Sequence, residues 1–505
     1  MLIDIYPCRD EFIQMARKGN VIPLCMEILG DTVTPVENLA RFLKDDTPLF
    51  LLESVEGGER WGRYSFMGTK ARELIEIYDN RVEVTLGDHV RRIPHQGDPL
   101  PVMRKLMSRY KPVPQTRLPR FRGGAVGYFN YESASFFEAI PHHWPSDKPM
   151  ARFIITGNLL IFDNLRHVLT LTELVFVGDN QDPGRAYDKG ASKLQGLYSK
   201  IRDNADYQPI APGDNLELET VTPPERFRED VSRVREHILT GDIIQGVYSQ
   251  PFRCNHPVDP WMLYRVMRYV NPSPYMFFIK IGGPVLVGSS PETMVRLEGG
   301  VATLRPIAGT RPRGITPRED QLLAEELLSD PKERAEHLML VDLGRNDLGK
   351  VADTGTVQVT DLMMVEKYSH VMHLTSNINC NLRRDLDCWD LFRSAFPAGT
   401  LTGAPKIRAM EIIAGLEKEP RGPYGGAVGY ISFDGNMDMA ITIRTAQVER
   451  DHFTIQAGAG IVADSDPERE RQETINKAMA LQKTLSMVTG INPGLTQGCN
   501  GEVSP

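Results

Sequence analysis

The stretch Asp330–Leu343, DPKERAEHLMLVDL, contains the clearest helix start in the chain. Aspartate is a good N-cap and proline is favoured at the first helical position, so the stretch predicts a helix that runs to about its last residue. Asp466-Pro467 repeats this pair and predicts a second helix, which ends near Met487. Between them, Tyr368–Ile378 and Ile441–Val448 are rich in β-branched residues and predict strands. Because strands and helices are mixed without regular βαβ alternation, the sequence predicts an α+β fold.

One hexapeptide occurs twice in the chain. GGAVGY at 123–128 recurs verbatim at 425–430. Glycines inside a strand allow another backbone or a ligand to approach closely. The two copies therefore predict two similarly packed strands, one in each half of the chain.

The composition shifts most clearly at 203–224, where four prolines and five acidic residues occur together. This segment predicts an exposed linker, with a long surface loop inside one domain as the alternative. We accordingly divide the chain into an N-terminal region at 1–202, the linker, a C-terminal region at 225–488 and a tail at 489–505. The end of the tail, from Gly494, is polar and aperiodic, and we expect it to be disordered.

Composition and charge exclude several classes of protein. The chain has 505 residues, of which 41% are hydrophobic and 25% charged, and these proportions exclude collagen-like and disordered chains. Its 58 basic and 66 acidic side chains leave a net charge of −8. This balance gives no reason to expect binding to nucleic acid or to an anionic membrane.

The cysteines and the N-terminus suggest a compartment. Six cysteines are scattered without a CxxC pair, which argues against a disulfide framework and a zinc ribbon and suits a reducing environment. No apolar run is long enough to span a bilayer. The first residues, Met1-Leu2-Ile3-Asp4, lack the basic region of a signal peptide. We therefore expect a cytoplasmic protein.

Three glycine-rich segments are candidates for binding an anion, because glycine beside a hydroxyl group can present backbone N–H groups. RPIAGTRPRG at 305–314 also supplies arginines, whereas PAGTLTGAPK at 397–406 lacks the spacing of a Walker A loop. GAG at 458–460 follows a predicted strand that ends near Gln456 and lacks the spacing of a dinucleotide-binding loop. Taken alone, the segment at 305–314 is a weak signal, because many basic loops are merely solvated.

Three further side chains are candidates for metal binding or proton transfer. Glu336 lies on a mostly apolar helix, and Glu473 lies four residues before Lys477 on the second helix. They could be oxygen ligands for Mg²⁺, which needs few protein carboxylates, or they could be a solvated helix face and an i,i+4 ion pair. His373 lies in a predicted strand, where it could be a base or a packed, hydrogen-bonded residue.

Read together and in order, these segments resemble the chorismate-utilising enzyme family from about residue 225 to residue 485. Within the family, the chain most resembles the large subunits of anthranilate synthases. The segments that carry the resemblance are SSPE (289–292), RPIAGTRPRG (305–314), AEHLMLVDLGRND (335–347), YSHVMHL (368–374), FPAGTLTGAPK (396–406), YGGAVGY (424–430), IRT (443–445), QAGAGIV (456–462) and QETINKA (472–478).

The resemblance implies a large mixed α/β chorismate-binding catalytic domain, with an N-terminal regulatory region packed against it. Its implied activity is a lyase reaction of tryptophan biosynthesis, in which chorismate and ammonia give anthranilate and pyruvate. Glu292 matches the family's general acid for the leaving C4 hydroxyl, and its pKa must be raised for that role. His373 matches the histidine associated with proton removal from C2. Glu336 and Glu473 match the ligands of a Mg²⁺ cofactor that holds the ring carboxylate.

The resemblance also implies a set of substrate-binding groups. Gly309 and Thr310 would lie beside the ring carboxylate, and Thr400 would be a further wall. Tyr424, Arg444 and the backbone of Gly458, Ala459 and Gly460 match positions that hold the enolpyruvyl carboxylate, and Lys477 is assigned to the same pocket.

Two positions separate the relatives from one another. Ala308 stands where aminodeoxychorismate synthases typically carry a nucleophilic lysine, and Gln245 stands where isochorismate and salicylate synthases carry a lysine that activates water. Both departures favour direct attack by ammonia. The alternatives are a relative that stops at the aminated intermediate, an aminodeoxychorismate synthase, or a tryptophan-sensing protein that has lost the chemistry.

The implied partners are a glutaminase subunit and a tryptophan effector. No cysteine lies in the glycine-rich turn, with downstream His and Glu, that a glutamine amidotransferase needs, so a separate subunit should supply ammonia from glutamine. LLES at 51–54 and NPSPYM at 271–276 resemble the two sides of a tryptophan site. The implied effector-binding residues, for feedback inhibition by L-tryptophan, are Ser54, Pro274, Tyr275 and Met276.

Overall fold

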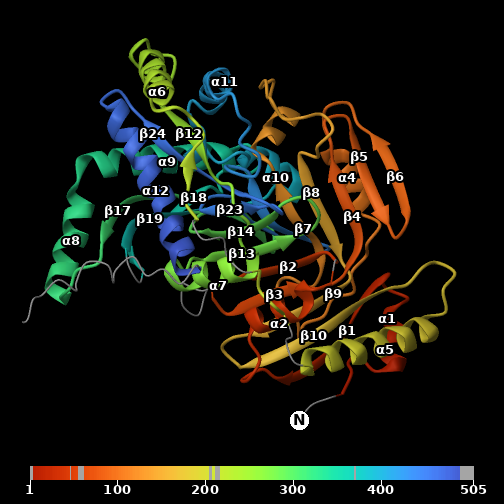
Figure 1. Ribbon diagram of the computed structural model, residues 1–505. Coiled ribbons are helices and arrows are strands. Elements are labelled where there is room, and N and C mark those ends of the chain that lie inside the picture. The colour runs from red at the N-terminus through yellow and green to blue at the C-terminus, as the bar shows by residue number, and fades with distance from the viewer. Residues whose placement is uncertain are drawn as a thin grey trace, which may run out of the picture.

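The computed structural model describes residues 4–45, 47–54, 62–203, 207–210, 216–368 and 371–488. It contains two large sheets whose neighbouring strands are all antiparallel, and helices pack on their outer faces (Figure 1). The polar tail, for which the sequence predicts disorder, lies outside the described residues. No helix of the described residues combines the length and the apolarity needed to cross a bilayer.

The first sheet joins strands from both halves of the chain. Its centre is the pair β2 and β13, in which Glu53 is opposite Met276 and Leu49 is opposite Lys280. The strands, in spatial order, are β1 (Val21–Leu29), β10 (Val168–Phe176), β9 (Asn158–Asp163), β3 (Tyr64–Gly68), β2 (Leu49–Glu53), β13 (Tyr275–Lys280), β14 (Val285–Ser290), β23 (Thr445–Val448), β24 (Phe453–Ile461), β12 (Gln245–Cys254) and β11 (Glu219–Thr220), with β20 (Gly403–Ala404) on β12.

The second sheet is joined by the repeated hexapeptide itself. The two copies lie on β7 and β21, which pair directly, with Gly127 opposite Gly429. The strands are, in order, β17 (Ile307–Pro312), β19 (Val371–Asn381), β16 (Val301–Leu304), β15 (Thr293–Glu298), β22 (Met437–Ile441), β21 (Ala427–Ser432), β7 (Gly124–Phe129), β8 (Ala151–Thr156), β4 (Ala71–Ile77), β5 (Arg81–Leu86) and β6 (His89–Pro94), with β18 (Gln358–Lys367) on β19.

The helices cover the outer faces of the two sheets. Figure 1 shows α1 and α5 along the sheet that carries β1 and β10, and α12 beside β24. The helices are α1 (Arg9–Met15), α2 (Pro35–Leu43), α4 (Leu100–Met107), α5 (Pro183–Arg202), α6 (Pro224–Leu239), α7 (Pro260–Val270), α8 (Pro317–Ser329), α9 (Pro331–Gly349), α10 (Cys388–Ala395), α11 (Lys406–Leu416) and α12 (Pro467–Val488), with short 3₁₀ turns η1 (Tyr131–Phe136) and η2 (Gly399–Leu401).

Alternation along β13 shows how the layers form. Successive side chains of a strand point to opposite faces. Phe277 and Ile279 join an apolar core between the two sheets, whereas Met276 and Phe278 join a core between the first sheet and its helices. Complete burial of each such side chain contributes about 1.5–3 kcal/mol, so strands from both halves are held firmly in one structure.

The helix starts agree with the sequence. Asp330 accepts hydrogen bonds from the backbone N–H groups of Lys332 and Glu333, and α9 begins at the following proline. Asp466 accepts from the N–H of Arg469 at 2.9 Å, at the start of α12. Helix α9 is longer than the sequence predicts, because it continues to Gly349.

Three sequence expectations need correction. Ile441–Val448 is not one strand, because the chain leaves the second sheet after β22 and enters the first at β23. The GAG segment at 458–460 does not follow a strand but lies inside β24. The 203–224 segment is not exposed throughout its described part, since Leu216 is buried in the core beneath the helices of the first sheet.

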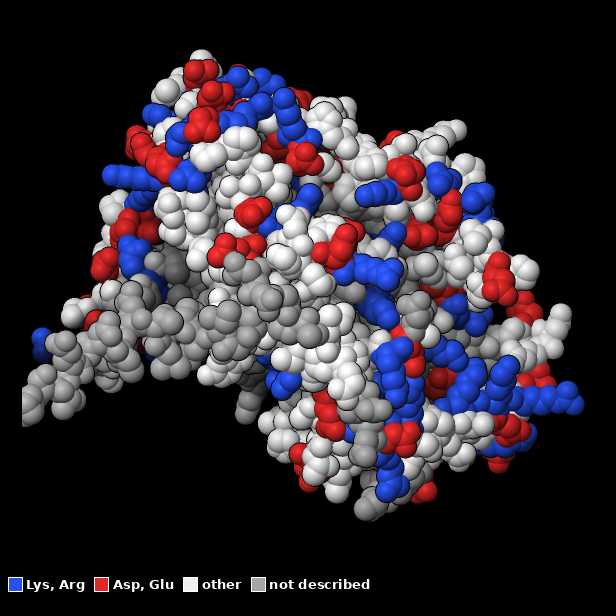
Figure 2. All heavy atoms as spheres, viewed as in Figure 1, with Lys and Arg blue, Asp and Glu red and all other residues white. Residues whose placement is uncertain are grey.

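Charged side chains of both signs cover the face drawn in Figure 2. They are interspersed over most of it, and the basic ones gather mainly at the lower right, where α5 lies in Figure 1. The basic residues of this helix are Arg185, Lys189, Lys193, Lys200 and Arg202.

Candidate active site

A cavity of about 590 Å³ contains almost all the predicted catalytic, metal-binding and substrate-binding residues. It lies where segments of both sheets, α9 and α12 converge. The predicted residues that line it are Glu292, Gly309, Thr310, Glu336, His373, Thr400, Tyr424, Arg444, Gly458, Gly460, Glu473 and Lys477. Ala459 does not line it, because alternation along β24 turns its side chain into the core beside α6 and α11.

Glu292 is the buried carboxyl group of this cavity. Burial raises its pKa to about 7, although Thr400 and Arg444 act in the opposite direction. A carboxyl group with this pKa retains its proton over part of the neutral range and can act as a general acid. The residue lies at the turn between β14 and β15, and its backbone carbonyl accepts a hydrogen bond from the N–H of Ile441 at 3.0 Å.

Arg444 reaches the cavity because the chain changes sheets at this point. Between β22 and β23 its backbone adopts φ of +50°, and its carbonyl accepts from the N–H of Ser289 at 3.2 Å. Burial lowers the pKa of Arg444, and the neighbouring Glu292 raises it. A guanidinium group in such a site is suited to a bidentate contact with a carboxylate.

His373 lies on β19 beside a bulge in β17. Its Nδ1 is 3.0 Å from the carbonyl oxygen of Gly309 and 3.0 Å from the hydroxyl of Thr310. The bulge falls between Ala308 and Thr310, where Gly309 has φ of +59°. Because a carbonyl oxygen can only accept, Nδ1 carries the proton, and Nε2 is then the nitrogen with a lone pair.

Carboxylates gather on the α9 and α12 side of the cavity. Burial, followed by the nearby Glu333, raises the pKa of Glu336, and Glu473 acts in the same direction. Glu473 also raises the pKa of Glu470, which is first raised by burial. Lys477 partly balances this charge, since its ammonium group lies 2.8 Å from Glu473 Oε1 and donates to the carbonyl of Gly458 at 2.9 Å.

These carboxylates fit a hard cation. The described residues form no set of three or more His, Cys, Asp or Glu side chains that could close around a metal ion. Two carboxylates in an open cavity nevertheless match the few protein oxygens that Mg²⁺ takes when substrate and water complete its shell. Crowding of Glu336, Glu470 and Glu473 would also be relieved by a bound positive charge.

The predicted effector residues line a second, much smaller cavity. Ser54, Pro274, Tyr275 and Met276 surround a volume of about 50 Å³ together with Asp438. The Tyr275 hydroxyl donates to Asp438 Oδ1 at 2.9 Å and is 2.9 Å from the Thr293 hydroxyl, next to Glu292. This volume is less than a tenth of that of the active-site cavity, so binding of a tryptophan molecule requires the walls to move.

Comparisons with known proteins decide the family. The model for chorismate binding enzymes matches residues 50–483. The chain belongs to this family. It is 43% identical to anthranilate synthase component 1 of Acetivibrio thermocellus over 489 residues, which cover 95% of this chain and 98% of that protein. It is 44% identical to the protein of the same name from Pseudomonas aeruginosa over 500 residues, with the same coverage of both chains.

A solved structure supports the same assignment. Anthranilate synthase component I of Streptococcus pneumoniae superposes with a TM-score of 0.72 at 34% identity, covering 90% of this chain and 98% of that one. The match extends over strands from both halves of the chain. The paired sheets described above are therefore shared with this relative.

Sequence reasoning missed several residues that line the active-site cavity of this chain. Lys332 lies one helical turn before Glu336 on α9, and Glu470 lies one turn before Glu473 on α12. Extending each predicted helix face by three or four residues would have found both. Tyr368 and Gln456 also line the cavity, and each is the first residue of a segment that carries the family resemblance, YSHVMHL and QAGAGIV, which is the signal that could have found them.

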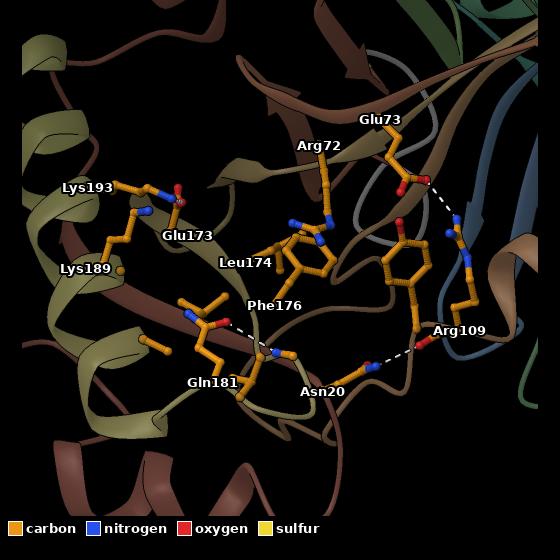
Figure 3. Close-up of a pocket in the computed structure, with 16 residues that line it drawn as sticks. Asn20, Arg72, Glu73, Arg109, Glu173, Leu174, Phe176, Gln181, Lys189 and Lys193 are labelled. Carbon is orange, nitrogen blue, oxygen red and sulfur yellow. Dashed lines mark hydrogen bonds and ion pairs between the residues drawn. The ribbon is translucent and has the colours of Figure 1, made fainter. Parts of the chain in front are cut away.

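A third cavity, of about 440 Å³, lies between α5 and the ends of β10 and β4 (Figure 3). Its two buried acids are paired, because Arg109 donates to Glu73 at 3.0 Å and Lys193 lies 3.3 Å from Glu173. Arg72 stacks over the ring of Phe176 at 4.2 Å. None of the predicted site residues lines this cavity, so we do not include it in the candidate active site.

Proposed function

We propose that this chain is the chorismate-converting component of an anthranilate synthase, a lyase of tryptophan biosynthesis. Ammonia and chorismate would give anthranilate, pyruvate and water. The observation that carries the proposal is the buried Glu292, with a pKa of about 7, beside Arg444 in a cavity that also holds His373. The named relatives, which span nearly the whole chain, support the same reaction.

The first step is an amination. The nitrogen of ammonia forms a bond to C2, the ring double bond shifts, and the C4–O bond breaks. The leaving oxygen takes the proton of Glu292 and departs as water. Burial keeps this proton on about half of the molecules at pH 7 and on most of them at lower pH, and general acid catalysis of this kind contributes about 100- to 10,000-fold to a rate.

The second step is an elimination that makes the ring aromatic. A base removes the proton from C2, the C3–O bond breaks, and the released enolpyruvate is protonated to pyruvate. His373 is the candidate base, because the hydrogen bond from Nδ1 to the Gly309 carbonyl leaves Nε2 as the proton acceptor. This bond also fixes the orientation of the ring.

The two substrate carboxylates would bind at opposite ends of the cavity. Arg444, Tyr424 and the backbone of Gly458 and Gly460 would hold the enolpyruvyl carboxylate. Gly458 is needed because a β-carbon there would lie 2.8 Å from the Tyr424 hydroxyl. At the other end, Glu336 and Glu473 would hold Mg²⁺, which neutralises the ring carboxylate when bound, and Thr310 would lie beside it.

The direct test is incubation of the purified chain with chorismate, Mg²⁺ and an ammonium salt. We expect anthranilate, identified by its fluorescence and by chromatography against standards. Accumulation of the aminated intermediate, or of a para-aminated product, would instead support one of the other family reactions. Ala308 on the cavity wall argues against the para reaction, since alanine offers no nucleophile.

The nitrogen source provides a further prediction. None of the five cysteines that the structure describes lines the cavity, and only Cys8 among them is exposed. Glutamine alone should therefore give no anthranilate, and ammonium should support the reaction increasingly as pH rises, since only uncharged NH₃ can attack. Adding a separate glutaminase subunit should restore the use of glutamine. Production of anthranilate from glutamine by the chain alone would contradict this.

Feedback inhibition is proposed for the small cavity at Ser54 and Met276. Tryptophan would enlarge this cavity on binding, and the contact of Tyr275 with Thr293, next to Glu292, connects it to the active site. Linkage makes the effect on binding reciprocal. Chorismate should therefore weaken tryptophan binding by the factor by which tryptophan weakens chorismate binding.

Ser54→Phe should abolish tryptophan inhibition of the ammonia reaction, because the larger side chain occupies the space that tryptophan needs. The uninhibited rate should stay within about twofold of the parent, as expected for a substitution away from the reacting groups. Ser54→Ala, which leaves the space open, is the matched control and should remain inhibited. A Ser54→Phe variant that loses catalysis but remains inhibited would show that this segment has been misassigned.

A further inference from the structure

Arg421 is a buried arginine directly behind the wall of the active-site cavity. Its side chain is 1% exposed, and it is among the largest fully buried side chains of the described residues. It does not line the cavity, so it is not a candidate for contact with chorismate. A guanidinium group is costly to bury unless its donors are satisfied, which makes its partners informative.

The guanidinium group of Arg421 holds three segments together. Nη1 donates to the carbonyl of Leu401 at 2.7 Å, and Nη2 donates to the carbonyl of Val247 at 2.7 Å. Nε and Nη2 also form a bidentate pair with Glu417, at 2.7 and 2.8 Å. Leu401 and Val247 both line the cavity, and Leu401 follows Thr400 directly.

Glu417 extends this network to β24, the strand that pairs with β12. Its Oε1 accepts from both the backbone N–H and the hydroxyl of Ser249, each at 2.8 Å. The same hydroxyl accepts from the side-chain amide of Gln456 at 2.8 Å, and Gln456 lines the cavity on β24. The charge of Arg421 is thus balanced by a carboxylate that is itself fully engaged.

Residues of the N-terminal half of the chain bind the backbone at Arg421 and Gly422. Glu132, on η1, accepts from the backbone N–H of Arg421 at 2.6 Å and from that of Gly422 at 3.1 Å. The N–H of Tyr131 donates to the carbonyl of Gly422 at 2.8 Å, and the Tyr131 ring lies 4.4 Å from the guanidinium carbon. Two residues further along is Tyr424, a wall of the cavity.

We propose that Arg421 is a positioning residue for chorismate: by bridging the carbonyls of Val247 and Leu401 while Glu132 anchors its backbone, it fixes the wall that carries Thr400 and Tyr424. The inference rests on the proposed function, because these are the groups assigned to the substrate. It also means that the N-terminal half supports the active site, since Glu132 belongs to that half.

Lysine cannot replace this arginine. Its ammonium group is a single point charge with three donors, whereas the planar guanidinium reaches two carbonyls and a carboxylate in different directions. In an Arg421→Lys variant at least one of these segments loses its anchor. Because displacement of binding groups by about 1 Å can cost about 100-fold in rate, a shift of this wall should be easily measured.

The test measures chorismate binding and turnover in the full-length chain. The dissociation constant of chorismate is measured by calorimetry with Mg²⁺ and without ammonia, and kcat and KM are measured with ammonia. Arg421→Ala should raise both the dissociation constant and the KM for chorismate by about 100-fold, with a smaller change in kcat, because ground-state and transition-state contacts with the carboxylate are lost together. Arg421→Lys should show most of this loss.

Chemical rescue separates positioning from general stabilisation. Millimolar guanidinium should bind in the space left by Arg421→Ala and restore chorismate binding at least about tenfold, whereas ammonium should not, because it lacks the planar fork. Unchanged binding in Arg421→Ala, or a loss that follows the melting temperature and is not rescued by guanidinium, would overturn the inference.

Glu132 provides a second pair of variants that does not depend on the stability of Arg421→Ala. Glu132→Gln keeps one oxygen in position to accept from both backbone N–H groups and should bind chorismate nearly as the parent does. Glu132→Ala leaves both groups unpaired and should weaken binding; equal binding by the two variants would count against the proposal. A parent chain that binds chorismate but forms no anthranilate would refute the proposed function alone, because the binding measurements still test Arg421 and Glu132.

Discussion

Replacing Glu292 by glutamine is expected to lower kcat for anthranilate formation by about 1,000-fold, within the range that general acids contribute. The amide keeps the size of the side chain but has no acidic proton to give to the leaving C4 hydroxyl. Chorismate binding measured about one pH unit below the pKa of Glu292, which is about 7, should change little, because the parent side chain is then largely uncharged. Rapid-mix and steady-state assays with ammonia measure kcat, and calorimetry measures binding.

The pH dependence of the parent enzyme gives an independent check on Glu292. Its pKa is raised, so the acidic form is present below about pH 7 and is lost above it. If the concentration of uncharged NH₃ is held constant, kcat should fall by about tenfold per pH unit once that value is passed, unless bound substrate shifts it upwards. Without this correction the fall would be masked by the rise in NH₃.

A matched control for Glu292 lies on the following strand. Glu298→Gln removes a half-exposed carboxylate of β15 that pairs with Arg296, outside the cavity. It should leave kcat within about twofold of the parent, as expected for a surface substitution. Near-normal turnover in Glu292→Gln would show that another group protonates the leaving hydroxyl.

Glu336→Gln and Glu473→Gln should each lower activity by at least about 100-fold, because hard-cation binding depends on the carboxylate charge. Burial and the neighbouring carboxylates already disfavour the negative charge of Glu336, so the neutral amide should not destabilise the fold. Glu473→Gln also removes the ion pair with Lys477. Titration of Mg²⁺ by calorimetry, with chorismate present, measures the metal affinity apart from the activity.

The control for the metal prediction is a carboxylate outside the cavity. Glu326→Gln loses an exposed contact with Arg311 at 3.0 Å and should keep the Mg²⁺ dependence of the parent. If Glu336→Gln or Glu473→Gln requires no more Mg²⁺ than the parent does, that residue is not a ligand. Melting temperatures of all three variants separate loss of metal from loss of folding.

Local chemistry along the chain was enough to predict several features. An aspartate followed by proline sets a helix start by capping and by the restricted φ of proline, which is why α9 and α12 begin where expected. The motifs of the C-terminal half, which follow one another in the family's order, indicated the family. The candidate side chains in these motifs do converge on one cavity.

Only the tertiary structure showed how the two halves combine. No local pattern could show that β2 pairs with β13, or that the two copies of GGAVGY pair with each other, because pairing between strands far apart in sequence depends on the whole fold. The segment at 203–224 therefore divides the chain in sequence only. Both sheets contain strands from before it and from after it.

The order of residues along the chain was enough to identify the side chains that could perform the chemistry, whereas the packing of the whole chain sets how they are held. Arg444 was identified from its motif, but its place in the cavity comes from a break between two strands where the sequence predicts one continuous strand. Arg421 and Glu132 carry no local signal, because a buried hydrogen-bond network joins residues from distant segments. The raised pKa of Glu292 is likewise a consequence of burial, which only the packed chain creates.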